Sequence, residues 1–307
     1  MTAPVVEISN LMKRYRDTSA LDDVSLTLQE NTLYGLLGRN GAGKTTLMSI
    51  LTAQNFETSG TVRVFGKHPY ENASVLSRMC FIRESQKYPD GFRPRHAFQA
   101  AAMFFPNWDQ QLCDQLIHDF ELPQDRTIKK LSRGQTSAVG VIIGLASRAE
   151  ITFFDEPYLG LDAVARQIFY DRLLAEYSEF PRTIVLSSHL IDEVANLLEH
   201  VIVLDHGRVV MDADADEIRG TAFTLIGPGA LVEEFIGGRE VIHRETIGSF
   251  ASVTVECPLS DLERREATEL GLDVAPVSLQ QLVVRRTAPD RPGRQGDSPA
   301  DRMEVVR

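Results

Sequence analysis

The chain has 307 residues, 43% of them hydrophobic and 24% charged, a balance typical of a globular protein rather than a disordered or fibrous one. Its net charge of -11 disfavours binding to nucleic acid or anionic lipid unless a local basic patch intervenes. The three cysteines lie far apart and form no CxxC pair, which argues against a disulfide framework or a zinc site and fits a reducing compartment.

The N-terminus lacks the basic and apolar regions of a signal peptide. The longest apolar stretches, such as Val139 to Ala146, are much shorter than the roughly 18 residues that indicate a membrane-spanning helix. We therefore expect any role at a membrane to depend on a partner.

Short apolar runs rich in β-branched residues recur along the first 220 residues. They predict strands at Val24–Leu28, Leu33–Leu37, Thr61–Phe65, Ile151–Phe154, Thr183–Leu186 and Val201–Leu204. Several are apolar almost throughout, as strands covered on both faces are. The pattern favours an α/β fold with a substantially parallel sheet.

A phosphate-binding pattern, GxxxxGK[ST], lies between the strand Leu33–Leu37 and a helical segment. It consists of Gly38, Arg39, Asn40, Gly41, Ala42, Gly43, Lys44 and Thr45, followed by Thr46. The glycines let backbone N–H groups surround phosphate oxygens, and the helix N-terminus adds a favourable dipole. Lys44 is expected to reach the β- and γ-phosphates and Thr45 to bind Mg²⁺, so ATP and Mg²⁺ are the predicted cofactors. This context disfavours the alternative of a chance glycine turn.

Strand patterns vanish between about Arg93 and Ser147. Apolar residues repeat there at helical spacing, at Phe98, Ala101, Ala102, Phe105, Leu112, Leu116 and Phe120. We predict an inserted helical subdomain over about 90–147, in which Trp108 packs at the start of the second helix.

Two carboxylates, Asp155 and Glu156, end the strand that begins at Ile151. Asp155 can hold the hydration shell of Mg²⁺, and Glu156 can polarise the water that attacks the γ-phosphate. The alternative is an ordinary helix cap. His189 ends the strand at Thr183–Ser188, where ligand crevices open in parallel sheets, so it can contact the phosphate or the water, or serve only as a cap.

The sequence changes character after Gly220. Strand patterns at Ala222–Ile226 and Ser252–Glu256 and a helical one near Leu259–Leu270 predict a small α+β accessory domain over 221–286. Residues 287–307 are polar and rich in Pro and Gly, which predicts a disordered tail.

Taken in order, these features resemble the nucleotide-binding subunit of ATP-binding cassette (ABC) transporters over about Val5 to Gly220. The most specific match is Leu131-Ser-Arg-Gly-Gln135, which is similar to the LSGGQ signature of that family. The resemblance implies a P-loop NTPase core of the ABC ATPase type over residues 1–220, with the helical subdomain inserted.

The resemblance also implies roles for individual residues. Tyr15 takes the position of the aromatic that stacks on adenine, and a strand-edge aromatic is the less favoured alternative. Leu159-Gly-Leu-Asp162 resembles the D-loop that couples two ATP sites, His189 the switch histidine, and Glu156 the residue that supports water attack.

A second ATP-binding subunit is the partner that the resemblance implies, in a homodimer or a heterodimer. In that family two cassettes sandwich two ATP molecules head to tail. Ser132, Gly134 and Gln135 would then act on the nucleotide of the partner.

The chain departs from the family pattern at two places. Arg133 replaces the first signature glycine, and it either pairs with phosphate or points outward. At the Q-loop, Glu84 stands where spacing places the glutamine, whereas the only glutamine nearby is Gln86. Either residue could contact the nucleotide, and Gln86 would add a ligand for Mg²⁺.

The segment Val277-Ser-Leu-Gln-Gln-Leu-Val-Val is similar to the end of many exporter-type subunits. We therefore expect an ATPase that powers an exporter through separate transmembrane permease subunits, peripheral at the cytoplasmic face of the cell membrane. One alternative is a soluble ABC-type ATPase acting on nucleic acid or the ribosome, which the single cassette and acidic charge disfavour. Another is an ATP-binding interaction module without useful hydrolysis.

Overall fold

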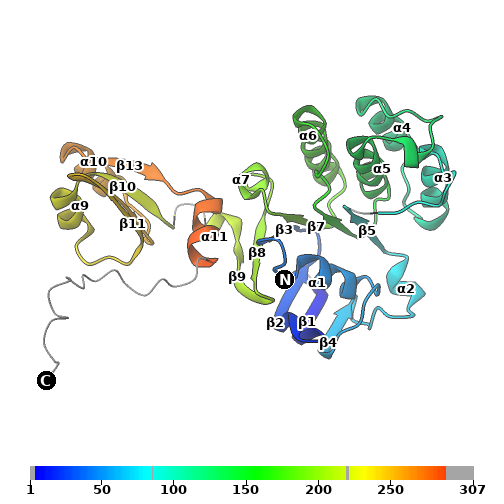
Figure 1. Ribbon diagram of the computed structural model, residues 1–307, viewed down its shortest axis with the longest axis horizontal. Helices are drawn as coiled ribbons and strands as arrows, with labels where there is room; N and C mark the ends of the chain where they lie inside the picture. Colours follow the sequence, from blue (N-terminus) through cyan, green and yellow to red (C-terminus); the bar gives the residue numbers. More distant parts are fainter. Residues whose placement is uncertain (1–3, 85, 219–220, 288–307) are drawn as a thin grey trace, which may run out of the picture.

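The fold comprises three β-sheets surrounded by helices (Figure 1), and a computed structural model describes residues 4–84, 86–218 and 221–287. The expected disordered tail therefore lies outside the described residues, apart from residue 287, which ends the last helix. Among the described helices, none combines the length and the apolar character needed to cross a membrane.

The largest sheet has the strand order β5-β6-β7-β3-β8-β9. Its strands are β3 (Leu33–Leu37), β5 (Met79–Arg83), β6 (Ile151–Asp155), β7 (Thr183–Ser188), β8 (His200–Asp205) and β9 (Arg208–Asp214). All neighbours pair in parallel except β9, which runs antiparallel to β8. Every residue of β3, β6 and β7 is buried, because structure covers both faces. The predicted α/β core is thus confirmed.

The two faces of this sheet are covered by different elements. Leu33 and Leu37 enter one core cluster, and Tyr34 and Leu36 enter the other, as the two-residue period of a strand requires. The helices α5 (Arg133–Ala146), α6 (Ala163–Glu179) and α7 (Ile191–Val194) cover the first face, and α1 (Lys44–Leu51) covers the second.

A three-stranded antiparallel sheet packs beyond α1, in the order β2-β1-β4. Its strands are β1 (Pro4–Tyr15), β2 (Thr18–Gln29) and β4 (Ser59–Val64). The predicted strands Val24–Leu28 and Thr61–Phe65 lie here, outside the parallel sheet. Burial in β2 and β4 alternates because one face of this sheet is open to solvent.

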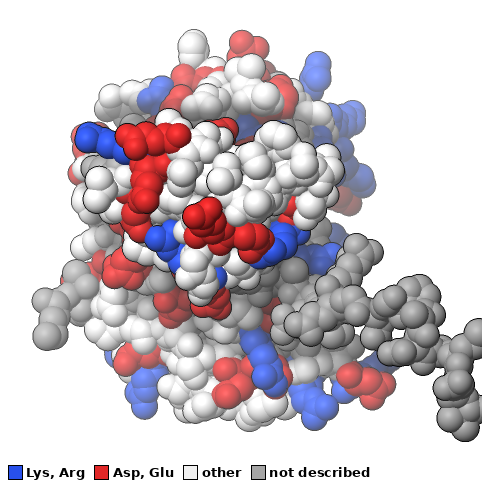
Figure 2. All heavy atoms as spheres, turned by 90° about the vertical axis from the view of Figure 1, so that its left-hand side faces the viewer, with Lys and Arg blue, Asp and Glu red and all other residues white. Residues whose placement is uncertain are grey.

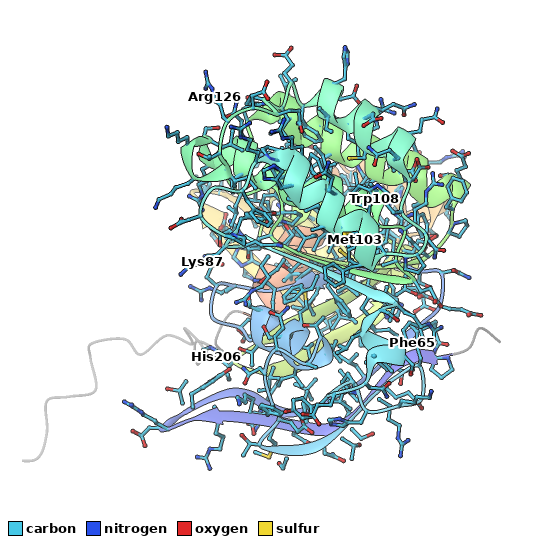
Figure 3. The ribbon with its side chains drawn as sticks, turned by 90° about the vertical axis from the view of Figure 1, so that its right-hand side faces the viewer. Phe65, Lys87, Met103, Trp108, Arg126 and His206 are labelled. Atoms are coloured by element: carbon cyan, nitrogen blue, oxygen red, sulfur yellow. The ribbon has the colours of Figure 1, made fainter. Side chains whose placement is uncertain are left out.

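A group of helices, shown from its own side in Figure 3, flanks the β5 edge of the large sheet. It contains α3 (Pro94–Phe104), α4 (Gln110–Asp119), a short 3-10 helix (Ile128–Lys130) and α5, and is preceded by α2 (Ala73–Leu76). Trp108 packs against the core and donates through its indole N–H to Gln110 Oε1 at 3.0 Å, whereas the Met103 side chain on α3 is exposed.

The C-terminal part forms a four-stranded antiparallel sheet, joined to β9 through α8 (Ala215–Ile218). The strand order is β11-β12-β10-β13, from β10 (Phe223–Pro228), β11 (Val241–Ile247), β12 (Phe250–Val255) and β13 (Asp273–Pro276), with α9 (Gly229–Ile236) and α10 (Asp261–Glu269). It has its own apolar cluster, and the face seen in Figure 2 carries interspersed acidic and basic side chains.

The last helix, α11 (Leu279–Thr287), returns to the α7 side of the large sheet (Figure 1). Leu282 and Val283 share one apolar cluster with Ile191 and Val194 of α7. The apolar residues of the Val277 segment therefore connect the small sheet to the core instead of filling the small sheet's own core.

Two ionic contacts of His200 on β8 join this strand to β9, at the edge of the large sheet. The ring nitrogens of His200 lie 2.6 Å from Asp214 Oδ1 and 2.7 Å from Asp212 Oδ1. Because both carboxylates only accept hydrogen bonds, both nitrogens must carry protons for the two contacts to form. Partial burial alone would lower the pKa of His200, but the two aspartates outweigh it, and the pKa lies above its usual value.

We expect His200→Gln to lower the free energy of unfolding by on the order of 1 kcal/mol at pH values below about 6.5. A histidine whose pKa is raised by folding contributes most below its unfolded pKa and loses that contribution as pH rises through the folded pKa. Urea unfolding from pH 5.5 to 8.5 should show the two proteins converging. The exposed His118→Gln is the control, and a difference for His200→Gln that does not change with pH would contradict this account.

Candidate functional site

The loop from Gly38 to Thr45 joins β3 to α1 and requires glycine for steric reasons. Gly38 and Gly43 have φ angles of 146° and 110°. A Cβ atom on Gly38 would lie 2.3 Å from the carbonyl oxygen of Leu204, and one on Gly43 would lie 2.6 Å from that of Ala20. No side chain caps the start of α1, so its first N–H groups are available to an anion.

Lys44, the first residue of α1, is buried against this loop. Its ammonium group donates to the carbonyl oxygens of Gly38 at 2.7 Å and Arg39 at 3.3 Å. It also lies 3.4 Å from Glu156 Oε1. The loop thus holds the ammonium group of Lys44 beside the C-terminal end of β6.

Asp155, the last residue of β6, accepts hydrogen bonds on both carboxylate oxygens. Thr45 Oγ1 donates to Oδ2 at 2.7 Å, and Ser187 Oγ donates to Oδ1 at 2.8 Å. Burial raises the pKa of Asp155, although the two hydroxyl groups oppose the shift. Ser187 was not predicted as a site residue, and its only sequence signal is a hydroxyl at the end of an apolar strand.

The hydroxyl of Thr45 and the carboxylate of Asp155 are oxygen donors of the kind that Mg²⁺ prefers. Among the described residues, no group of three or more His, Cys, Asp or Glu side chains is placed to hold a metal ion. This arrangement fits Mg²⁺, which usually keeps several waters and takes further ligands from nucleotide phosphates.

Glu156 follows Asp155 directly, and its side chain contacts both Lys44 and His189. Its Oε2 lies 2.8 Å from His189 Nδ1, and its Oε1 faces Lys44. Its backbone N–H donates to Ser187 Oγ at 2.9 Å. The backbone has a φ of 49°, a left-handed conformation that is unfavourable for a residue with a side chain. Such local strain is common at functional positions.

Tyr158 holds the histidine and was not singled out from the sequence. Its hydroxyl oxygen accepts the backbone N–H of His189 at 3.1 Å and lies 3.0 Å from Ser188 Oγ. Because the carboxylate of Glu156 only accepts, the proton in its contact with His189 resides on Nδ1. In the neutral ring, Nε2 then remains as an acceptor.

These side chains surround a cavity of about 490 Å³. Its lining comprises Ala20, Asn40, Gly41, Ala42, Gly43, Lys44, Thr45, Thr46, Glu84, Arg133, Asp155, Glu156, Leu159 and His189. The carboxyl ends of β3, β6 and β7 therefore bring together most of the predicted phosphate-loop residues, both carboxylates and His189.

Other predicted residues lie outside this lining. The Tyr15 side chain, at the end of β1, is exposed; its hydroxyl accepts a hydrogen bond from Asn55, and Lys13 Nζ lies 4.8 Å from its ring centroid. Gln86 Oε1 is buried and has no hydrogen-bond partner among the described residues. Of the two Q-loop candidates, Glu84 thus lines the cavity.

The signature residues begin α5. Ser132 Oγ accepts the Gln135 N–H at 3.1 Å, and Gln135 Oε1 accepts the Ser132 N–H at 3.1 Å, so the pair forms a capping box. A Cβ on Gly134 would lie 2.5 Å from the carbonyl oxygen of Gly160. Asp162 caps α6 by accepting the Ala165 N–H at 2.9 Å.

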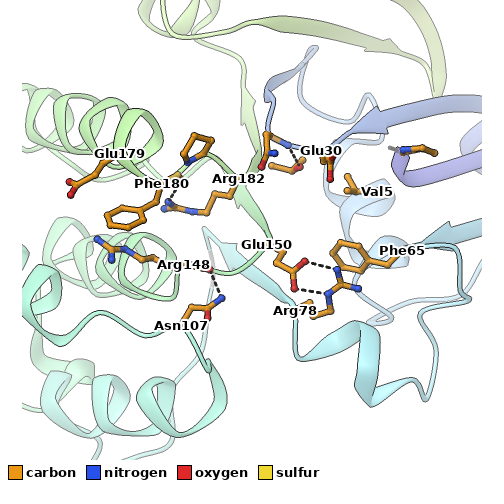
Figure 4. A pocket seen from close by; sticks show the side chains of 14 residues that line it. Val5, Glu30, Phe65, Arg78, Asn107, Arg148, Glu150, Glu179, Phe180 and Arg182 are labelled. Carbon is orange, nitrogen blue, oxygen red and sulfur yellow. Dashed lines mark hydrogen bonds and ion pairs between the residues drawn. The ribbon is translucent and has the colours of Figure 1, made fainter. Parts of the chain in front are cut away.

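A larger cavity of about 890 Å³ lies near the opposite ends of β6 and β7 (Figure 4). Arg78 donates there to both oxygens of Glu150, and Arg148 stacks on the ring of Phe180 with 3.5 Å to its centroid. The carboxylates in this lining offset its arginines, and no phosphate-binding loop contributes to it. The phosphate-binding loop therefore belongs to the smaller cavity.

Comparison with known proteins agrees with the site. Residues 21–159 match the family model described as ABC transporter. An uncharacterized ABC transporter ATP-binding protein of Methanocaldococcus jannaschii is 30% identical over 84% of this chain and 98% of its own length. The Nod factor export ATP-binding protein I of Sinorhizobium fredii is 27% identical over 92% of this chain and 85% of its own.

A solved structure shares the fold. It is a dimeric ATP-binding cassette in a post-hydrolysis state with ADP and phosphate, and it is 21% identical with a TM-score of 0.60. The similarity covers 68% of this chain and 98% of that one.

The left-handed backbone at Glu156 predicts an unusual order of stabilities. Both Glu156→Gly and Glu156→Ala delete the carboxylate, but only glycine relieves the strain, so we expect Glu156→Gly to be more stable by about 1 kcal/mol. Urea unfolding of the nucleotide-free protein measures the difference. At Glu150, whose φ is not positive, the order should reverse, and equal stability of the two variants at position 156 would contradict the argument.

Proposed function

This chain belongs to the family of ABC transporter ATP-binding proteins, and we propose that it is an ATP-hydrolysing subunit that drives export through separate transmembrane subunits. The observation that carries the proposal is the placement of Glu156 between Lys44 and His189, beside the phosphate loop. A module that only binds ATP has no need of this arrangement.

ATP binding is assigned to the loop and to Lys44. The open N–H groups of the loop and of α1 face the phosphates, and Lys44 exchanges its contacts with loop carbonyl oxygens and Glu156 for phosphate oxygens. Thr45 and Asp155 would hold Mg²⁺ or its water shell, and Mg²⁺ supplies neutralisation of phosphate charge. The exposed Tyr15 is the proposed stacking residue for adenine.

Hydrolysis is assigned to Glu156 and His189. Glu156 accepts a hydrogen bond from the attacking water and aligns it with the γ-phosphate, while its other oxygen retains His189. With Nδ1 bonded to Glu156, the Nε2 atom of His189 is the nitrogen available to the phosphate or water. Tyr158 positions the histidine through the backbone N–H at 3.1 Å.

A second cassette completes the proposed site. Ser132, Gly134 and Gln135 begin a helix whose N–H groups carry partial positive charge, yet they do not line the chain's own cavity. The solved dimeric cassette with ADP and phosphate supports a sandwich in which these residues face the partner's nucleotide, with Asp162 near the junction.

Export and membrane location are proposed from the relative named for Nod factor export and from the absence of a spanning helix among the described residues. The chain would then lie at the cytoplasmic face of the membrane on permease subunits encoded separately. Co-purification with a multi-span membrane protein in detergent tests this partner. Recovery with ribosomes or nucleic acid instead would favour the soluble alternative.

Replacing Glu156 with Gln should reduce ATP hydrolysis by at least about 10²-fold while ATP still binds, because the amide keeps the shape but loses the basic carboxylate. Phosphate release and ATP binding are measured on the same preparation.

The matched control is Glu150→Gln, just before β6 and in the wall of the other cavity, which should hydrolyse ATP at the wild-type rate. Wild-type hydrolysis by Glu156→Gln would overturn the assigned mechanism.

A further inference from the structure

The two residues that depart from the family pattern contact each other. Arg133 Nη2 forms an ion pair with Glu84 Oε1, although 49 positions separate them in the sequence. Arg133 begins α5 in the helical part, and Glu84 follows β5 of the large sheet. The pair therefore connects the signature segment to the Q-loop within one chain.

Stability does not account for this pair. The side chains are 68% and 40% exposed, and exposed ion pairs contribute little to folding. The start of α5 is also held to the segment after β6: Ser137 Oγ donates to the carbonyl oxygen of Leu159 at 2.6 Å, and Gly134 packs closely on Gly160. The pair can open without releasing α5.

The pair lies beside the phosphate loop. Arg133 and Glu84 both line the cavity that contains the phosphate loop, and Lys44 is the other Lys or Arg side chain among its described lining residues. A terminal phosphate carries more negative charge than one carboxylate and matches the two-pronged donor geometry of a guanidinium. The terminal phosphate also repels the carboxylate of Glu84. An arriving γ-phosphate therefore competes directly for Arg133, whereas ADP has no such group.

We propose that Arg133 distinguishes ATP from ADP in this protein: it pairs with Glu84 in the nucleotide-free state and transfers to the γ-phosphate when ATP binds. This role rests on the proposed function. The shared chemistry is a terminal phosphate, from either the chain's own loop or a facing cassette. Glu84 acts as the competitor that Arg133 must leave.

The test measures the dissociation constants of ATP and ADP, with Mg²⁺, for single and double variants. Arg133→Gln should lower the preference for ATP over ADP about tenfold, as expected when one charge-assisted contact is lost. Glu84→Gln should increase the preference several-fold, because it removes the competitor. Arg133→Lys, which keeps the positive charge, should retain part of the preference for ATP over ADP.

The double variant Arg133→Gln, Glu84→Gln should match Arg133→Gln alone, because Glu84 acts only through Arg133. Arg244→Gln is the matched control, since Arg244 on β11 forms a similarly exposed ion pair with Glu233 on α9. It should leave the preference unchanged.

Light scattering on the same samples identifies the source of the phosphate. A preference that depends on Arg133 in the monomer assigns the chain's own nucleotide, and one confined to the dimer assigns the partner's. Unchanged preference in Arg133→Gln, or an undiminished Glu84→Gln effect in the double variant, would overturn the proposal. If Glu156→Gln still blocks hydrolysis in that case, only this inference has failed.

Discussion

The site depends on the carboxylate of Glu156, which connects side chains that follow three strands of the large sheet. Lys44 reaches it from the loop after β3, and His189 reaches it from the end of β7, while Glu156 itself follows β6. The contacts need adjacent parallel strands, the glycine-dependent loop that folds Lys44 back, and the left-handed backbone that turns Glu156 toward both partners. Burial of the strands fixes their register, and the site depends on that register, because shifting one strand by a residue would separate these groups.

The parallel core and the phosphate loop could be predicted because they depend on local sequence. Leu33–Leu37 and Ile151–Phe154 are apolar almost throughout, and the loop pattern lies directly between a strand and a helix. The first strand of the antiparallel sheet was not predicted, because Asn10, Lys13 and Arg14 interrupt any simple apolar run in β1.

Long-range contacts could not be predicted in the same way. The hydrogen bonds of Ser187 and Tyr158 depend on strand order, which no local pattern specifies. The pairing of Arg133 with Glu84 likewise joins segments that only the fold brings together. The sequence identified both residues as departures from the family pattern without indicating that they are partners. The packing of the apolar residues of α11 on α7 could not be predicted from the sequence either.

The most direct test of the central claim is a structure of the Glu156→Gln variant with ATP and Mg²⁺. The account predicts the terminal phosphate in hydrogen-bond contact with Lys44 Nζ, the side chain at position 156 facing a water in line with the γ-phosphate, and His189 directed at the same group. A triphosphate bound with its terminal phosphate away from Lys44, or with position 156 turned away from it, would contradict the account.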